Sequence, residues 1–190
     1  TKTLSKRLPG VSLDFSSLAK GYAVDLAADT LERLNIKDFM LEIGGEVIVR
    51  GESPRGDAWR IAVAQPQPES FGSIHVAIEL RDTAIATSGD YRNFFEYEEK
   101  RYSHLIDPRS GYPLQHELVS VTVIHESAMM ADAWATALII MGSDAAMELA
   151  EDKGLAVYML ERQGDDLRVL MSETMRNWFD DDVSEKLAAD

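Results

Sequence analysis

The sequence predicts an α+β fold in which helices pack on a mainly antiparallel sheet. Three observations support this fold class. Short strand-like segments follow one another with turn residues between them, as at Gly44-Gly45. Two longer segments carry apolar residues at helical spacing. The 190 residues contain no internal repeat and no linker, so we expect one domain over residues 1–179 and an acidic tail at 180–190.

The chain is expected to begin with a strand followed by a helix. Residues 11–15 alternate between apolar and polar side chains and predict a short strand. The helical spacing that follows continues to Leu34, and Ser16 or Ser17 is expected to cap this helix. Gly21 lies inside the helix, where glycine costs about 1 kcal/mol relative to alanine. We therefore expect another segment to pack closely against the backbone there.

A series of strands is predicted after this helix. They are expected at residues 39–43, 46–50, 59–64, 74–80 and 84–87. Proline residues mark a loop at 65–72, and Ser88-Gly89-Asp90 is expected to end the strand before it. Next come a hairpin at 94–97 and 101–105, a rigid loop at 107–113 and a strand at 119–124.

The last third of the chain predicts two helices, a pair of strands and a final short helix. The helix at 127–141 is apolar on most faces and is therefore expected to lie in the core. The remaining elements are an amphipathic helix at 144–153 that ends at Gly154, strands at 155–160 and 167–171, and a helix at 172–179.

Composition and charge exclude several classes of protein. The chain has 19 Lys+Arg against 33 Asp+Glu, a formal net charge of −14. This charge argues against nucleic acid as a partner and against an anionic membrane surface. The absence of cysteine excludes disulfides, thiolate metal sites and cysteine nucleophiles. A phosphate ligand would have to be held by a metal ion, a helix N-terminus or a few placed basic residues.

The first candidate site is the segment 14–22, where a predicted strand ends in Asp14 and a helix begins with hydroxyl residues, Lys20 and Gly21. The free N–H groups at a helix N-terminus suit a phosphate. The alternative is a serine-capped helix with a solvated lysine, and the spacing alone leaves both open.

The second candidate is the loop 103–113, which two prolines and a glycine make rigid. His104 at its start has the chemistry of a general base near neutral pH. Asp107 either orients the imidazole or caps the turn. The alternative is a turn that contains an incidental histidine.

The third candidate is the pair Asp132 and Thr136, which lie four residues apart and so share one face of a mostly apolar helix. A buried carboxylate without a partner is costly. A carboxylate beside a hydroxyl suggests a hard-cation site of the Mg²⁺ type. The alternative is that Asp132 caps the helix while Thr136 bonds its own backbone.

These segments, in this order, resemble the FAD:protein FMN transferase (ApbE) family. The matching segments are residues 13–25, 42–46, 86–93, 103–113 and 131–137. The resemblance extends from Leu13 to Phe179 and implies that the chain corresponds to the C-terminal portion of such an enzyme. The family implies Mg²⁺-dependent transfer of the FMN half of FAD to a threonine hydroxyl of an acceptor protein, with release of AMP.

The resemblance also implies roles for particular residues. Ser17, Asp132 and Thr136 fall at the metal-ligand positions, where Ser17 contributes through its backbone carbonyl or its hydroxyl. His104 falls at the position proposed as the general base for the acceptor threonine. His104 and Asp132 are therefore the expected catalytic residues.

The expected FAD contacts are Asp14, Lys20 and Ile106. The acceptor is expected to be a subunit of a membrane redox complex that carries a threonine flavinylation motif. The family further implies a periplasmic location with a lipid anchor upstream of this chain. The alternatives are an FAD pyrophosphatase that releases FMN and AMP, and a non-catalytic flavin-binding module.

Overall fold

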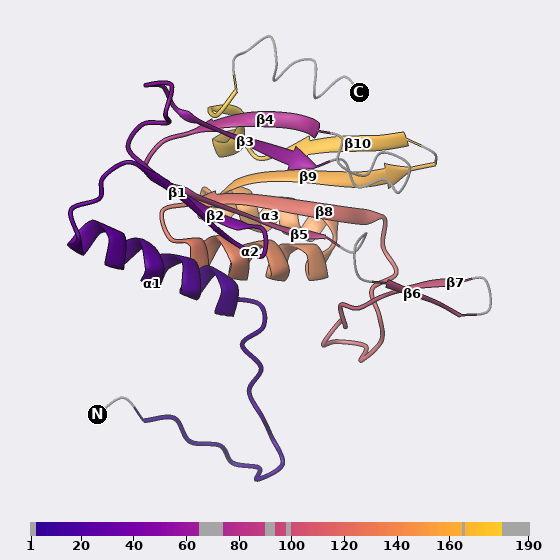
Figure 1. Cartoon of the computed structure of the whole chain (residues 1–190). Coiled ribbons are helices and arrows are strands. Elements are labelled where there is room, and N and C mark those ends of the chain that lie inside the picture. The colour runs from indigo at the N-terminus through magenta and orange to yellow at the C-terminus, as the bar shows by residue number, and fades with distance from the viewer. Residues whose placement is uncertain (1–2, 65–73, 90–93, 98–99, 165, 180–190) are drawn as a thin grey trace.

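The computed structural model describes residues 3–64, 74–89, 94–97, 100–164 and 166–179 (Figure 1). The helices are α1 (Ala19–Arg33), α2 (Ala128–Met141), α3 (Ser143–Lys153) and α4 (Glu173–Arg176). The strands are β1 (Phe39–Ile43), β2 (Glu46–Arg50), β3 (Trp59–Ala64), β4 (Ile74–Leu80), β5 (Ala84–Gly89), β6 (Phe94–Tyr97), β7 (Lys100–Ser103), β8 (Leu118–His125), β9 (Ala156–Gln163) and β10 (Asp166–Met171).

Six strands form the central sheet, in the order β1-β2-β5-β8-β9-β10. Every neighbouring pair in this sheet is antiparallel. Two further antiparallel ribbons, β3–β4 and β6–β7, lie outside it. The predicted α+β class with a mainly antiparallel sheet is therefore confirmed. Within the described residues, no helix is both long and apolar enough to cross a membrane.

The sheet is the middle of three layers (Figure 1). Helices α1, α2 and α3 cover one face, and the β3–β4 ribbon with α4 covers the other. Alternation along the strands builds both interfaces, because successive side chains of a strand point to opposite faces. In β9, for example, Tyr158 and Leu160 face the ribbon side, whereas Val157 and Met159 face α2 and α3.

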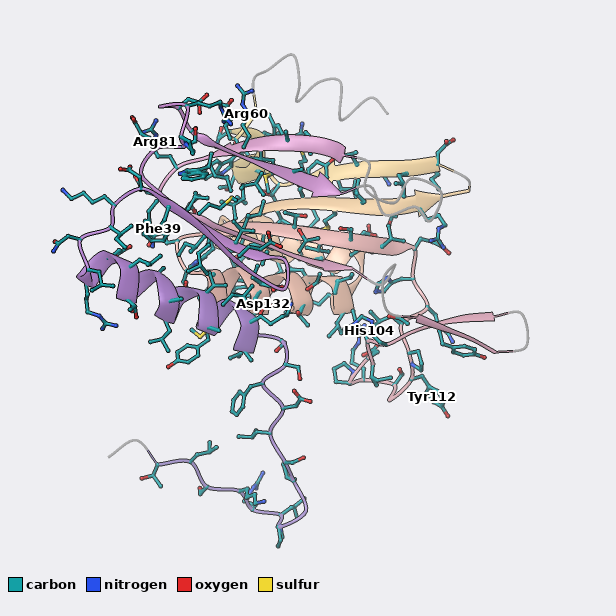
Figure 2. The ribbon with its side chains drawn as sticks, viewed as in Figure 1. Phe39, Arg60, Arg81, His104, Tyr112 and Asp132 are labelled. Atoms are coloured by element: carbon teal, nitrogen blue, oxygen red, sulfur yellow. The ribbon has the colours of Figure 1, made fainter. Side chains whose placement is uncertain are left out.

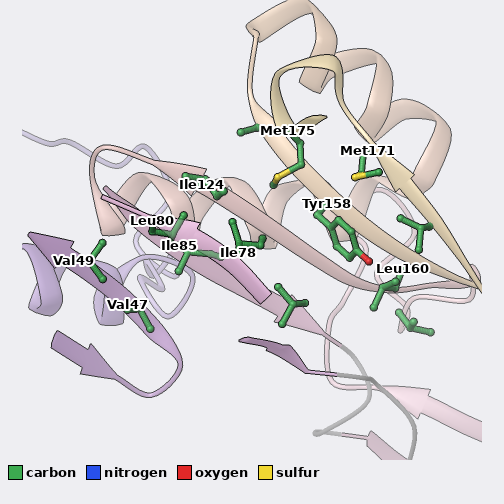
Figure 3. Packing of buried hydrophobic residues seen from close by; sticks show 14 residues of the cluster. Val47, Val49, Ile78, Leu80, Ile85, Ile124, Tyr158, Leu160, Met171 and Met175 are labelled. Carbon is green, nitrogen blue, oxygen red and sulfur yellow. The ribbon is translucent and has the colours of Figure 1, made fainter. Parts of the chain in front are cut away.

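The ribbon-side core is shown in Figure 3. It joins Val47 and Val49 of β2 to Ile78 of β4 and Met175 of α4, all of them buried. Ile48, which lies between the two valines, faces the opposite way, toward α1. The alternation of side chains along β2 therefore determines which face of the β1–β2 hairpin packs against α1.

The structure departs from the sequence-based prediction at several element boundaries. Residues 11–15 do not form a strand; Val11, Leu13 and Phe15 are exposed, and the segment runs away from the sheet (Figure 1). Within the described residues, no neighbouring strand pairs with this segment, so its alternation of apolar and polar side chains does not place it in a sheet. Strand β5 continues through Ser88 and Gly89 instead of ending at residue 87, because both pair with β8.

Other boundaries shift by a few residues. Strand β9 extends to Gln163, three residues beyond the prediction, because its end pairs with β10. Helix α4 covers four residues rather than the predicted eight, and the Ser172 side chain caps it by accepting from the Met175 N–H. The predicted loop 65–72, the break at Asp90 and the tail 180–190 lie outside the described residues.

Helices α1 and α2 cross in close contact at Gly21. A Cβ atom at this position would lie 2.3 Å from the Ala128 carbonyl oxygen and 2.6 Å from the Met129 Cα. These distances are far inside van der Waals contact, so only glycine fits. The prediction that a segment packs closely at Gly21 is confirmed, and the segment is the first turn of α2.

Each of the two crossing helices also supplies a carboxylate to the start of the other. Asp25 of α1 accepts hydrogen bonds from the Ser127 hydroxyl at 2.6 Å and from the N–H groups of Ala128 at 2.7 Å and Met129 at 3.1 Å. In return, Asp132 of α2 accepts a bond from the Gly21 N–H. Because the N–H groups in the first turn of a helix have no partner within that helix, these side chains satisfy them.

Replacing Gly21 with Ala is expected to destabilise the protein by about 3 kcal/mol, because the added methyl group meets backbone atoms of α2. Helix propensity alone predicts the opposite sign, a gain of about 1 kcal/mol. Urea denaturation measures the difference. Gly10→Ala is the matched control, since no atom lies within 4 Å of the Cβ position there. A Gly21→Ala protein as stable as wild type would contradict the close crossing.

Candidate functional site

The candidate site lies where the N-terminus of α1 meets a buried acid of α2 (Figure 2). The Gly21 N–H donates to Asp132 Oδ2 at 3.1 Å, and Asp132 is 3% exposed. Asp132 does not cap its own helix, because Ser127 does so by accepting from the Met130 N–H at 3.2 Å. The alternative that Asp132 caps its own helix is therefore wrong, because its carboxylate accepts a hydrogen bond from the start of the neighbouring helix α1.

Burial dominates the electrostatics of Asp132. Removal from water raises the pKa of this carboxyl above its usual value, and the Gly21 N–H and the Lys20 charge act in the opposite direction. The partial positive charge at a helix N-terminus favours an anion at this place. A second positive charge near Asp132 would add to the effect of the Gly21 N–H and Lys20, and would further favour the ionised form of this carboxyl group.

Thr136 lies one helical turn after Asp132, as the spacing predicts. Its hydroxyl oxygen is 3.0 Å from the Ser88 hydroxyl oxygen of β5. The contact exists because β5 continues past residue 87 and brings Ser88 beside α2. Sequence reasoning missed Ser88 as part of the site, since Ser88-Gly89 has the composition of a chain break.

A lysine–glutamate ion pair lies at the same helix start. Lys20 Nζ donates to Glu46 Oε1, and the side chains of Lys20 and Glu46 are 46% and 2% exposed. Burial raises the pKa of the Glu46 carboxyl; Lys20 opposes this rise and the nearby Asp132 charge adds to it. Lys20 therefore acts on two buried acids that come from different elements.

The segment before α1 forms a tight turn around Asp14. Its carboxylate accepts from the Ser16 N–H at 2.7 Å and from the Ser16 hydroxyl. These bonds lower the pKa of Asp14. The predicted serine cap is wrong: the N-cap residue of α1 is Leu18, without a side-chain cap, and Ser16 is turned to Asp14 instead. Ser17 is half-buried in this same turn.

The predicted loop 103–113 closes on itself. Asp107 accepts from the Arg109 N–H at 2.8 Å and binds the Arg109 guanidinium through both oxygens, which lowers the pKa of Asp107. Ile106 forms a bridge with Pro113. These bonds support the turn-closing role of Asp107 that the sequence left open.

The predicted site residues thus lie in two groups. Lys20 and Asp132 meet at the start of α1, Thr136 lies one helical turn after Asp132 beside Ser88, and Asp14 and Ser17 lie in the chain that leads into α1. Exposed His104 lies on the other loop, next to the β6–β7 ribbon and apart from Asp132 (Figure 2). Exposed Ile106 shares that loop. Their functional roles stay predictions.

The chemistry of the first group suits a hard cation that also binds an anionic ligand. Within the described residues, no cluster of three or more His, Asp or Glu side chains forms a complete metal site. The predicted ligands are one carboxylate, Asp132, and two residues that offer hydroxyl or carbonyl oxygens, Ser17 before α1 and Thr136 within α2. Mg²⁺ commonly binds through one or two carboxylates and completes its shell with phosphate oxygens and water.

The fold and site together define an α+β domain in which two buried acids and a lysine lie beside a helix crossing. The chain matches the ApbE family over residues 1–159 and belongs to that family. It is 46% identical over 160 residues to the FAD:protein FMN transferase of Haemophilus influenzae, which covers 84% of this chain and 46% of that protein. The Escherichia coli K12 protein of the same name is 39% identical, with 96% of this chain and 51% of that protein covered.

Solved structures agree with this assignment. The flavin transferase ApbE from Vibrio cholerae superposes with a TM-score of 0.83 at 40% identity, covering 92% of this chain and 55% of that one. The ApbE protein from Thermotoga maritima gives a TM-score of 0.78 at 32% identity, with 90% and 54% covered. The chain spans about half the length of the curated relatives it matches.

Replacing Asp132 with Asn is expected to stabilise the metal-free protein by on the order of 1 kcal/mol. The amide oxygen still accepts from Gly21 N–H, while the buried charge is gone. Thermal denaturation in EDTA and in Mg²⁺ measures this. Mg²⁺ is expected to raise the Tm of wild type and of the control, but not the Tm of Asp132→Asn. Asp144→Asn, which neutralises an exposed acid of α3, is the control. An Asp132→Asn protein that is less stable in EDTA would contradict the costly burial of this charge.

Proposed function

We propose that the protein transfers the FMN half of FAD to a threonine hydroxyl of an acceptor protein, with Mg²⁺ and with release of AMP. The observation that carries this proposal is the buried Asp132 carboxylate, which accepts from the N–H of Gly21 at the N-terminus of α1, next in the chain to the cationic Lys20. An acidic protein needs such a local arrangement to hold a diphosphate. Relatives named FAD:protein FMN transferase support the choice of FAD.

The reaction exchanges the phosphoanhydride bond of FAD for a phosphoester bond to the acceptor threonine. The acceptor hydroxyl oxygen forms a bond to the FMN-side phosphorus while the bond from that phosphorus to the bridging oxygen breaks. AMP leaves with the bonding electron pair. The proton of the hydroxyl passes to His104, whose imidazole is the proposed base. Phosphoryl transfer depends on positioning and charge neutralisation more than on covalent chemistry.

The residues at the helix crossing would supply this neutralisation. Asp132 and Thr136 are the proposed side-chain ligands of Mg²⁺, with Ser17 as a third oxygen source. A bound Mg²⁺ would polarise phosphoryl oxygens and reduce the charge of the diphosphate. Lys20 would offer its ammonium to the diphosphate, and Asp14 and Ile106 would contact other parts of FAD.

The acceptor is proposed to be a protein with an exposed threonine in a flavinylation motif. The exposure of His104 supports this, because a base that serves a second protein must lie at the surface. The same exposure leaves His104 open to water, so hydrolysis of FAD to FMN and AMP is the competing outcome of any assay.

Asp132→Ala is expected to lower the rate of AMP release from FAD by a factor of 100 or more, because removing a metal ligand removes most of the charge neutralisation. Chromatography of AMP in the presence of Mg²⁺ and an acceptor peptide measures this rate. Asp144→Ala is the matched control on α3. Retention of AMP release by Asp132→Ala would refute the proposed metal role, and FMN release without a covalent peptide adduct would refute the transferase.

His104→Ala is expected to slow flavin transfer to the acceptor peptide by a factor of about 100. Mg²⁺ affinity should change little, since His104 lies on a loop apart from Asp132, which belongs to helix α2. Mass spectrometry of the flavinylated peptide, beside a Mg²⁺ titration followed by Tm, measures both. An unchanged transfer rate would remove the general-base role.

A further inference from the structure

Glu46 is placed to control where the Lys20 ammonium lies. We infer that Glu46 is a positioning residue, which anchors Lys20 so that its charge is presented to the diphosphate of the ligand instead of collapsing onto Asp132. The inference rests on the proposed function for the identity of the ligand. The contact itself is between Lys20 Nζ and Glu46 Oε1.

The burial of Glu46 is difficult to explain by folding alone. It is the first residue of β2 and is 1% exposed, and the three residues after it in the strand are buried and apolar. An acid in such a strand is costly unless its oxygens are paired. Its second oxygen, Oε2, is buried without a hydrogen-bond partner among the described residues. Because only one of the two Glu46 oxygens has a partner, folding alone does not account for this buried acid, and a functional role would.

The turn before β2 is shaped to let the lysine pass. Gly44 has a φ of 64°, and a Cβ atom there would lie 3.1 Å from Lys20 Cδ. The absence of a side chain at Gly44 therefore leaves room for the aliphatic stem of Lys20 to reach Glu46 over the hairpin. The helix fixes one end of this side chain and Glu46 fixes the other.

Asp132 makes this anchoring necessary. Lys20 acts on the pKa of both Asp132 and Glu46, so the two acids compete for one ammonium. A direct Lys20–Asp132 pair would occupy the carboxylate oxygens that are proposed to bind Mg²⁺. With Glu46 as the partner, Lys20 stays next to the helix N-terminus with nearly half of its side chain exposed, and it does not occupy the Asp132 oxygens.

Coulomb's law and the positioning role predict opposite results for the removal of the Glu46 charge. Loss of a negative charge beside a polyanion site should tighten the binding of a diphosphate. Loss of the anchor should weaken it, because Lys20 is no longer held in place. The sign of the effect therefore distinguishes the two.

The experiment measures the dissociation constant of ADP, a diphosphate probe that the proposed transfer does not consume, by calorimetry in Mg²⁺. Lys20→Met and Glu46→Gln are each expected to weaken binding about tenfold, the loss of one well-placed charge-assisted contact. The double variant K20M/E46Q is expected to bind no more weakly than Lys20→Met alone, because Glu46 acts through Lys20. Glu42→Gln removes an exposed acid from the same hairpin and should leave the constant within twofold.

The results separate the inference from the proposed function. Tighter or unchanged ADP binding by Glu46→Gln, additive losses in the double variant, or no binding by wild type would overturn the positioning role. If the E46Q protein does not fold, Glu46→Asp provides the second measurement: its shortened carboxylate should weaken ADP binding, and unchanged binding would overturn the role. AMP release from FAD by the wild-type protein is assayed separately. If this release fails while the ADP dissociation constants are as expected, the proposed function is refuted and the positioning role of Glu46 is retained.

Discussion

The contact between α1 and α2 at Gly21 is the constraint on which the rest of the site depends. Because no Cβ atom separates the two backbones, the first turn of each helix comes within reach of a carboxylate from the other. Asp25 closes the start of α2, and Asp132 closes the start of α1. The sheet then holds both helices in place, because Val24 and Ala28 of α1 and Leu138 of α2 pack against it. The position of the buried acid is therefore set by backbone packing and not by a loop.

The net negative charge of the chain determines what kind of ligand the helix crossing could bind. A formal charge of −14 would repel a diphosphate from most of the surface. At the start of α1, a lysine and the Gly21 N–H meet two buried carboxylates, and Lys20 lowers the pKa of both. The two carboxylates outnumber the one lysine, so a polyanion that arrives together with a cation suits this site better than a polyanion alone.

Local sequence signals predicted most of the fold, whereas the pairing of distant residues lay beyond them. The Gly44-Gly45 hairpin and helix α2 follow from turn chemistry and apolar spacing, which are properties of a few adjacent residues. The helix cap failed because Ser16 had a nearer partner in Asp14. The Gly21 position was predicted to pack closely, but its partner lies more than a hundred residues away. Glu46 belonged to a recognised segment, yet only the structure shows its bond to Lys20.

The two carboxylates at the crossing differ in a way that separates structure from function. Asp25 accepts three hydrogen bonds and joins the helices much as a cap should. Asp132, in the equivalent place on the other helix, has Gly21 as its hydrogen-bond donor within the described residues, and burial raises its pKa. A fold selected for stability alone would treat both positions alike. The second oxygen of Asp132, Oδ1, takes no part in the bond from Gly21, and a bound cation would use this oxygen where a further N–H group would otherwise have bonded to it.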